Sequence, residues 1–330
     1  VRQFPGINIY ACIQAWAKDT GQLEKRVKIR MFASEFDEAI HLMDSHIQEV
    51  SDSIQLSLLY ARIRFFLGEY DEAEHSYAWI VRRFGLSPST CYHYLYFCLH
   101  TGRYDKLGEL LDRCRRMNLA NKAYFLASLK LHQRDIGGSF PALCDLDSHR
   151  EMQHLLGDKC VRSLDEVHEG ERLLVIACSG VGDEIGNAIF YQRIAERCCG
   201  QTTFTCDPRL YSFFARSLPH ILLEPVCRLR HLNDMASSPG EYADLPSSAF
   251  VSMFDNHGYA LFKKADKVIL DFDAVRSVVK GYEDFSGLAR MKADENLVRQ
   301  YQAQLPDDGK LNVGLCWRSA LKRYSRARNY

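Results

Sequence analysis

Apolar side chains recur at helical spacing through the first third of the chain. Residues 54–67 show the pattern most clearly, at Leu56, Leu59, Tyr60, Ile63 and Phe66. This spacing predicts a helix that packs through one face. Gly68 is expected to end that helix, and a second helix is expected from Tyr70 to Phe84, so the two form a helical hairpin.

The hairpin pattern repeats with a fixed period. Three segments share a small residue, an aromatic residue two positions later and then an aspartate: Ser34–Ala39, Gly68–Ala73 and Gly102–Leu107. Successive aromatic residues among Phe36, Tyr70 and Tyr104 are 34 positions apart. Such a period resembles the tetratricopeptide repeat (TPR), a helical hairpin that buries its apolar face by stacking on its neighbours. The resemblance implies an N-terminal TPR α-solenoid over residues 1–150.

A TPR array implies a concave groove that binds a protein or a peptide. A degenerate fourth hairpin is expected, in which Gly138–Phe140 repeats the pattern of Gly102–Tyr104 two positions late. The candidate groove residues lie on the first helices of the hairpins: Arg62, His93, Tyr94 and Tyr96. The alternative is that these side chains pack against neighbours or face solvent.

Beyond about residue 165 the pattern of apolar positions changes. Residues 172–178 form a short, nearly continuous apolar run, as expected for a strand buried on both faces. Helix and strand patterns then alternate: a helix at Glu184–Cys198, strands at Thr202–Cys206, Ile221–Val226 and Lys267–Phe272, and a helix at Asp294–Gln304. This alternation predicts a parallel sheet with covering helices, a Rossmann-like lobe over residues 165–310. The expected fold class is therefore α plus α/β.

A final buried strand is expected at Leu311–Trp317, followed by a basic segment. A strand at this point should lead into a helix, yet the sequence stops at Tyr330. We therefore expect residues 311–330 to begin a second lobe and the chain to be a fragment of a longer protein.

The composition limits the classes of molecule that this protein is expected to bind. Lys plus Arg number 42 and Asp plus Glu number 42, so no net charge favours nucleic acid or a membrane surface. Apolar runs stay well short of the roughly 20 residues that span a bilayer. The 12 cysteines show no Cys-x-x-Cys pair and the histidines are isolated. We therefore predict reduced thiols, no metal site and a cytoplasmic protein.

The turn after the first predicted strand leaves three alternatives open. Ser179–Asp183 contains two glycines, Gly180 and Gly182, at a strand-to-helix junction. It is a tight turn capped by Asp183, a dinucleotide or methyl-donor site with Asp207 as the ribose partner, or an acceptor loop of a sugar transferase. A full dinucleotide motif is not present, because the third glycine is missing.

Three segments in order resemble bacterial TPR proteins with a C-terminal glycosyltransferase-like domain: Gly182–Ile185, Cys206–Pro219 and Val313–Ser319. They are similar to the heptosyltransferase and O-linked N-acetylglucosamine transferase group of GT-B folds. The resemblance implies a two-lobed enzyme, in which the first lobe holds the acceptor and the second binds a nucleotide-sugar as substrate, with no cofactor.

The resemblance also assigns residues. It implies Asp183 as the base that deprotonates the acceptor hydroxyl, with Glu184 as the substitute, and Gly180 and Gly182 as the acceptor loop. Asp207–Arg209 is expected to be structural. The residues expected to approach the donor diphosphate are Arg318, Ser319, Lys322, Arg326 and Arg328.

For these basic residues the alternative is a solvated basic segment. Because most of the donor lobe is missing from the 330 residues, this chain alone is expected to be inactive. The alternative function is a non-catalytic TPR scaffold that mediates protein–protein interaction.

Overall fold

The computed structural model describes residues 22–198, 200–229, 239–286 and 291–305. The chain divides into two compact units, which within these ranges comprise residues 22–120 and residues 121–305. Each unit is described by itself. The sequence placed the boundary near residue 150, whereas residues 121–150 group with the sheet because α10 (Ile136–Cys144) packs against α16 (Asp271–Val278).

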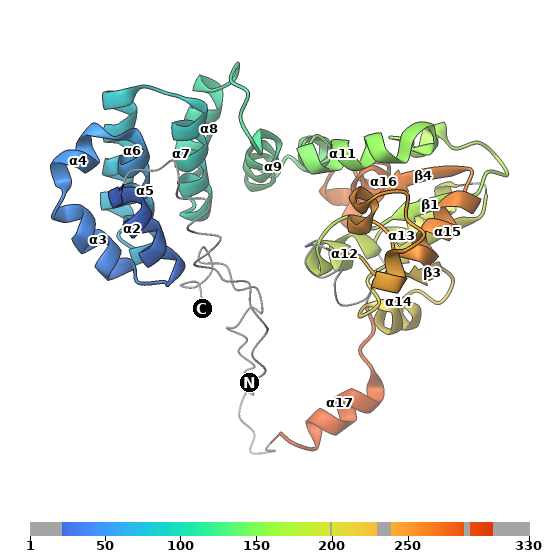
Figure 1. Ribbon diagram of the computed structural model, residues 1–330. Coiled ribbons are helices and arrows are strands. Elements are labelled where there is room, and N and C mark those ends of the chain that lie inside the picture. The colour runs from blue at the N-terminus through green and yellow to red at the C-terminus, as the bar shows by residue number, and fades with distance from the viewer. Residues whose placement is uncertain (1–21, 199, 230–238, 287–290, 306–330) are drawn as a thin grey trace. The chain divides into compact units, whose positions relative to one another are not determined.

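The first unit is a series of helices (Figure 1). In chain order they are α2 (Gln22–Phe32), α3 (Phe36–Asp44), α4 (Ile47–Asp52), α5 (Ile54–Leu67), α6 (Tyr70–Phe84), α7 (Pro88–His100) and α8 (Tyr104–Arg113). The pairs α2–α3, α5–α6 and α7–α8 pack as hairpins, and α5 also packs against α7. The helical hairpins expected from the 34-residue period are therefore present, while their assignment as TPR units stays a prediction.

One turn geometry closes each hairpin. Ser34, Gly68 and Gly102 have φ values of 62°, 80° and 71°, in the left-handed region. In each turn the next residue donates its N–H to a carbonyl five positions back, as Glu69 does to Arg64 at 3.0 Å. This pattern ends a helix and reverses the chain, which explains why a small residue recurs at this position.

A fourth hairpin is present, but its predicted register is wrong. Helices α9 (Lys122–His132) and α10 are joined at Arg134, which has a φ of 62°. Asp135 donates to the carbonyl of Lys130 at 2.8 Å, as in the other turns. The turn thus comes two positions earlier than an exact repeat, not two later. The sequence pattern missed it because an arginine holds the position of the glycine.

The core of the first unit is aromatic and aliphatic. Phe36 and Phe66 are buried and their ring centroids lie 5.3 Å apart, which joins α3 to α5. Cys91 and Cys114 form a disulfide that links α7 to the end of α8. The prediction of reduced thiols is wrong for this pair, because the hairpin brings together two cysteines that are 23 positions apart in the sequence.

The second unit contains a four-stranded parallel sheet in the order β3-β2-β1-β4, which confirms the predicted parallel sheet. The strands are β1 (Leu173–Ile176), β2 (Thr202–Cys206), β3 (Leu222–Pro225) and β4 (Lys267–Leu270). Leu173 pairs with Thr202 on one side and with Lys267 on the other. Strand β1 therefore lies inside the sheet, as its continuous apolar run predicted.

The rest of this unit is largely helical (Figure 1). Besides α9, α10 and α16 its helices are α11 (Asp147–Leu156), α12 (Val181–Ala188), α13 (Tyr191–Arg197), α14 (Tyr211–Ser217), α15 (Asn256–Lys264) and α17 (Glu295–Gln302). Short 3-10 helices occupy Gly157–Lys159, Leu164–Glu166, Pro239–Tyr242, Ser248–Ser252 and Tyr282–Phe285. The single helix expected at Glu184–Cys198 is two, α12 and α13. The expected strand at Leu311–Trp317 lies outside the described residues.

Both faces of the sheet are buried in separate hydrophobic clusters. Leu173 and Val175 belong to one cluster together with Phe214 of α14. Leu174 and Ile176 belong to the other, on the side of α11 and α15. The alternation follows the two-residue period of a strand. Within the described residues, no helix is long and apolar enough to cross a membrane.

The hairpin turns predict opposite effects for two substitutions at equivalent positions. We expect Gly68→Ala to lower the free energy of unfolding by about 1 kcal/mol, because an L-residue is disfavoured at positive φ. No heavy atom lies within 4 Å of the added Cβ, so backbone strain is the only cost. Ser34→Gly should raise stability by a few tenths of a kcal/mol. Urea unfolding measures both values. A Gly68→Ala protein that is as stable as the wild type would contradict the turn geometry.

Candidate functional site

A group of buried polar residues in the second unit lies at the carboxyl edge of the sheet, among them Glu184 and Asp271. The chain passes from β1 to β2 and β3 on one side and then returns to β4 on the other side of β1. The strand order therefore reverses between β1 and β4. In open α/β sheets, ligands bind outside the carboxyl ends of the strands at such a point. The loop after β1, residues 177–180, lies at this point together with Asp271, which follows β4.

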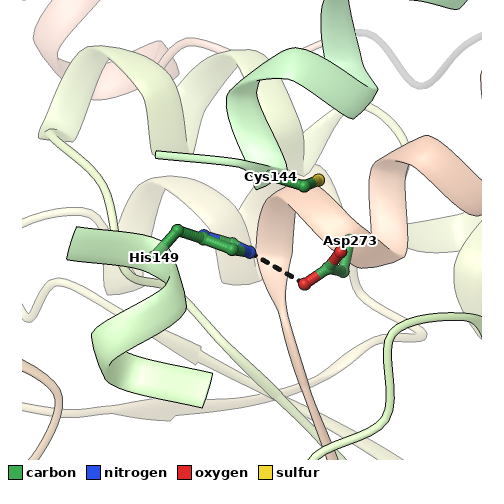
Figure 2. Close-up of side chains that lie close together, drawn as sticks. All are labelled: Cys144, His149 and Asp273. Carbon is green, nitrogen blue, oxygen red and sulfur yellow. Dashed lines mark hydrogen bonds and ion pairs between the residues drawn. The ribbon is translucent and has the colours of Figure 1, made fainter. Parts of the chain in front are cut away.

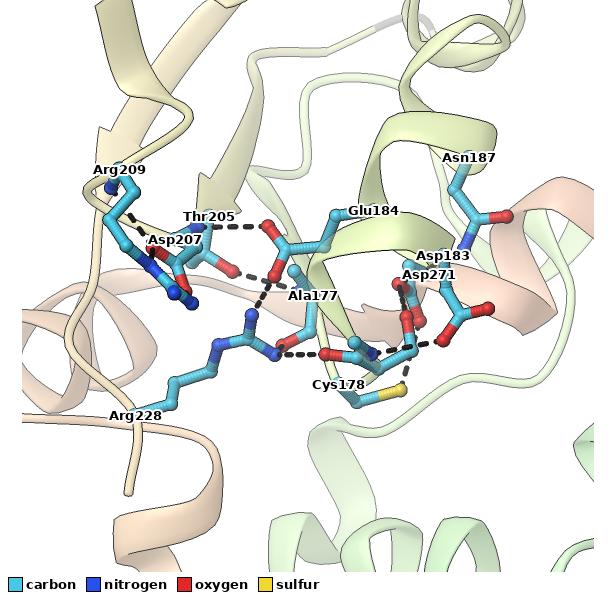
Figure 3. Close-up of polar contacts among 12 residues, drawn as sticks. Ala177, Cys178, Asp183, Glu184, Asn187, Thr205, Asp207, Arg209, Arg228 and Asp271 are labelled. Carbon is cyan, nitrogen blue, oxygen red and sulfur yellow. Dashed lines mark hydrogen bonds and ion pairs between the residues drawn. The ribbon is translucent and has the colours of Figure 1, made fainter. Parts of the chain in front are cut away.

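Asp271 ties these two strand ends together. It is buried, and it accepts hydrogen bonds from Cys178 Sγ at 2.9 Å, Ser179 Oγ at 3.1 Å and Asn187 Nδ2 at 3.1 Å. Figure 3 shows Cys178 of the β1 loop and Asn187 of α12 near Asp271. Burial and the adjacent carboxylate raise the pKa of the Cys178 thiol well above its usual range. Cys178 is therefore a hydrogen-bond donor here and is unsuited to nucleophilic chemistry.

Glu184, one of the two acids singled out from the sequence, forms a buried ion pair with Arg228 (Figure 3). The side chain of Glu184 is 0% exposed and that of Arg228 is 7% exposed. Glu184 also accepts the backbone N–H of Asp207 at 2.8 Å. Because both carboxylate oxygens are engaged and buried, Glu184 serves the structure of the edge and is poorly placed to act as a base.

Arg228 extends this connection to β1. Its Nη1 donates to the carbonyl of Ala177 at 2.7 Å and to that of Ser179 at 3.2 Å. One guanidinium thereby joins the loop after β3, the loop after β1 and helix α12. A guanidinium has five donors in a fixed fork, which suits it to several acceptors at once. The sequence analysis missed Arg228, since nothing in its local sequence marks it.

Asp183, the other acid, is exposed at the start of α12. Its Oδ2 accepts the backbone N–H of Gly180 at 3.1 Å, so it caps the helix as the first alternative predicted. Gly180 has a φ of −73°, and neither it nor Gly182 has a positive φ. No heavy atom lies within 4 Å of a Cβ built on Gly182, so the space beside Gly182 is open.

At the end of β2, Asp207 pairs with Arg209. Arg209 donates to it through Nε at 2.9 Å and Nη2 at 2.7 Å, and through its backbone N–H at 2.9 Å. This arrangement agrees with the structural role expected for Asp207–Arg209. The predicted donor-side residues Arg318, Ser319, Lys322, Arg326 and Arg328 lie outside the described residues, so the structure does not place them.

The candidate groove residues of the first unit make packing contacts. Tyr94 is buried and stacked on Tyr77, with ring centroids 5.3 Å apart. The Arg62 guanidinium lies 5.6 Å from the centroid of Phe66. Burial, and then the Arg62 charge, lower the pKa of His93 to about 4. The pattern of residue types could not separate groove from core here.

The structure shows two further features that the sequence analysis missed. A pocket of about 390 Å³ lies among α4, α5 and α6, lined by side chains that include Ile47, Tyr60 and Trp79. In the second unit, the potential ligand atoms of Cys144, His149 and Asp273 all lie within 4.8 Å of one another (Figure 2). Neither group shows a short-range motif, because each draws its residues from separate helices.

Because Glu184 is buried in an ion pair and Asp183 is exposed, we expect substitutions of these two acids to differ greatly in their effect on stability. Glu184→Gln should lower the free energy of unfolding by about 3 kcal/mol, because it leaves the buried Arg228 charge without a partner. The matched Asp183→Asn substitution should cost less than about 1 kcal/mol, because it weakens only an exposed cap. Urea unfolding of both variants makes the comparison, and equal effects would contradict the assigned roles.

The lowered pKa of His93 in the folded state predicts that the protein loses stability in acid. Its pKa in the folded state is about 4, against about 6.5 in an unfolded chain. Above pH 6.5 both states are neutral; between pH 6.5 and 4 the unfolded chain binds a proton that the folded protein does not. The free energy of unfolding should therefore fall by up to about 3 kcal/mol over this window. His93→Gln should remove this fall from the pH dependence of the free energy of unfolding. A His93→Gln protein with the same pH dependence as the wild type would refute the prediction.

Comparison of the chain with models of known families, with curated proteins and with solved structures finds no significant match. The relation to TPR proteins and to GT-B glycosyltransferases therefore rests on the motifs alone and stays a prediction. Any function must be argued from the geometry of the sheet edge and of the helical hairpins.

Proposed function

We propose that this protein is a glycosyltransferase of the GT-B type, in which the parallel sheet belongs to the lobe that holds the acceptor. The observation that carries the proposal is that two adjacent acids at the carboxyl edge of β1 have different environments. Glu184 is buried against Arg228, whereas Asp183 is exposed and the space beside the preceding Gly182 is open. The edge thus presents one carboxylate to a ligand and uses the other to hold its own loops.

Asp183 is the proposed base. Its Oδ2 accepts the Gly180 N–H, which limits how the carboxylate can turn and so helps to fix its direction. As the acceptor hydroxyl oxygen forms a bond to the anomeric carbon, Asp183 takes the hydroxyl proton and the nucleoside diphosphate leaves with the bonding electrons. Arg318, Lys322 and the other basic residues of the final segment are proposed to neutralise the charge on that leaving group.

The helical hairpins are proposed to recruit the acceptor or a partner protein. A repeat array offers an extended surface, and its neighbouring units hold one another in place. Arg103 illustrates such a link, since it pairs with Glu74 at 2.5 Å and with Asp71 at 3.0 Å across adjacent hairpins. A rigid array binds with less loss of conformational freedom than a flexible one does.

A second candidate function is that of a non-catalytic scaffold. It is favoured by the pocket among α4, α5 and α6, where the partly exposed Trp79 lies beside apolar side chains. Aromatic side chains in such pockets commonly anchor a partner protein. Under this hypothesis the helical hairpins bind the partner and the sheet has no nucleotide-sugar substrate.

Activity of the full-length protein tests the proposal. We expect Asp183→Asn to lower kcat for turnover of a UDP-, ADP- or GDP-sugar by at least about 100-fold, because an amide does not accept the proton. Asp294→Asn is the control, since Asp294 is another helix-capping aspartate, at the start of α17, and it is not part of the β1 loop.

Circular dichroism should show both variants folded. Unchanged turnover in Asp183→Asn would remove the assigned base. Calorimetry that detects no nucleotide-sugar binding to the wild-type protein would favour the scaffold instead.

A further inference from the structure

Three side chains of metal-binding type meet inside the second unit, where α10, α11 and α16 converge. They are Cys144 at the end of α10, His149 on α11 and Asp273 on α16, and they are 5%, 3% and 1% exposed. Figure 2 shows the imidazole of His149 directed at the carboxylate of Asp273, with Cys144 beside both. His149 Nε2 lies 2.8 Å from Asp273 Oδ2.

The distances suit a single ion. All three potential ligand atoms lie within 4.8 Å of one another. Around a tetrahedral zinc ion, nitrogen, oxygen and sulfur ligands stand about 3.3–3.6 Å apart, as follows from the usual bond lengths. To bind one ion, His149 Nε2 and Asp273 Oδ2, which lie 2.8 Å apart, would separate by about half an ångström, and a wider pair within the 4.8 Å limit would close by up to about 1.5 Å.

Two buried acceptors at this group have no hydrogen-bond partner. They are Asp273 Oδ1 and Gln153 Oε1. The Gln153 amide belongs to the same group, because its Nε2 donates to Asp273 Oδ2 at 2.6 Å. Leaving such atoms unsatisfied in a buried place costs free energy, and native proteins seldom tolerate it. Asp273 Oδ1 has an ion pair with Arg276 at 3.5 Å, whereas Gln153 Oε1 has no hydrogen-bond partner. A bound cation would give Gln153 Oε1 a partner, and this independent observation points to a ligand.

Charge also favours a divalent cation. A Cys144 thiolate and the Asp273 carboxylate together supply two negative charges, which balance those of one divalent ion. One cation, Arg276, lies 3.5 Å from Asp273 Oδ1 as an ion pair and also donates to the carbonyl of Arg162 at 2.6 Å.

The surroundings of His149 fit a metal ligand. Its Nδ1 faces the sulfur of Cys178 at 3.8 Å, and Cys178 in turn donates to Asp271. Metal-binding histidines usually engage the second ring nitrogen in this way, which fixes the ring orientation. With Nδ1 protonated, Nε2 offers its lone pair to the ion.

We propose that Cys144 Sγ, His149 Nε2 and the Asp273 carboxylate bind a structural Zn²⁺ ion, with Gln153 Oε1 in the fourth position. Thiolate and imidazole ligands select zinc over magnesium or calcium. The four side chains are 7% exposed or less, as expected for a structural zinc site, which leaves no position for a substrate. The ion joins α10 and α11 to α16 and so fixes residues 136–153 against the sheet.

No metal site was expected from the sequence, because that expectation rested on the absence of paired cysteines. Here the ligands come from positions 144, 149 and 273, so that only the fold brings them together. The proposal is independent of the glycosyltransferase hypothesis, since the ion takes no part in the reaction at the sheet edge.

The test uses the full chain, stripped of metal by a chelator and titrated with Co²⁺ and then with Zn²⁺. We expect one equivalent of Co²⁺ to give the thiolate-to-cobalt charge-transfer band in the near ultraviolet and the visible bands of a tetrahedral site. Zn²⁺ should displace it. Cys144→Ser should abolish the charge-transfer band and weaken Zn²⁺ binding at least about 10-fold. Cys206→Ser is the control, because Cys206 is also a buried free thiol of this unit and belongs to no metal-binding group.

Loss of the band in Cys144→Ser but not in Cys206→Ser supports the proposal, as does a fall in Tm of the wild-type protein when the chelator is added. A wild-type protein that gives no thiolate-to-cobalt band overturns it, and so does a band that persists in Cys144→Ser. X-ray absorption at the zinc edge of the wild-type protein requires no variant. It should show one sulfur ligand, and a first shell of nitrogen and oxygen alone would refute the site.

Discussion

The buried Arg228 charge is the constraint on which the carboxyl edge of the sheet depends. A guanidinium with 7% exposure must find acceptors inside the protein, and it finds Glu184 and the carbonyls of Ala177 and Ser179. Those acceptors belong to α12 and to the β1 loop, whereas Arg228 follows β3. The requirement to neutralise one charge therefore fixes three separate segments and leaves Asp183 as the exposed acid beside them.

Next to this ion pair, Asp271 imposes a second constraint from the other side of β1. It gathers donors from Cys178, Ser179 and Asn187, so the β1 loop is held between the ends of β3 and β4. Cys178 then leads, through His149, to Asp273 and the proposed zinc ion. The same polar chain thus runs from the sheet edge to α10 and α11. Such a preorganised edge is what a catalytic carboxylate requires.

The sequence predicted the features that depend on local patterns. The hairpins followed from Gly68 and Gly102 at a fixed period, and the buried strand β1 followed from its apolar run. Features that depend on distant partners escaped prediction. Arg228 lies 44 positions from Glu184, and Asp273 lies 124 positions from His149, so neither pair has a short-range pattern. At the fourth turn Arg134 occupies the glycine position, which concealed the register.

The central claim is that the carboxyl edge of β1, with Asp183 at its rim, meets the reacting sugar. A crystal structure of the full-length protein with a non-transferable nucleotide-sugar analogue tests it most directly. The account predicts that the anomeric carbon of the bound sugar faces the Asp183 carboxylate, with room between them for an acceptor hydroxyl. A sugar bound elsewhere on the protein, with Asp183 turned away from it, would contradict the account.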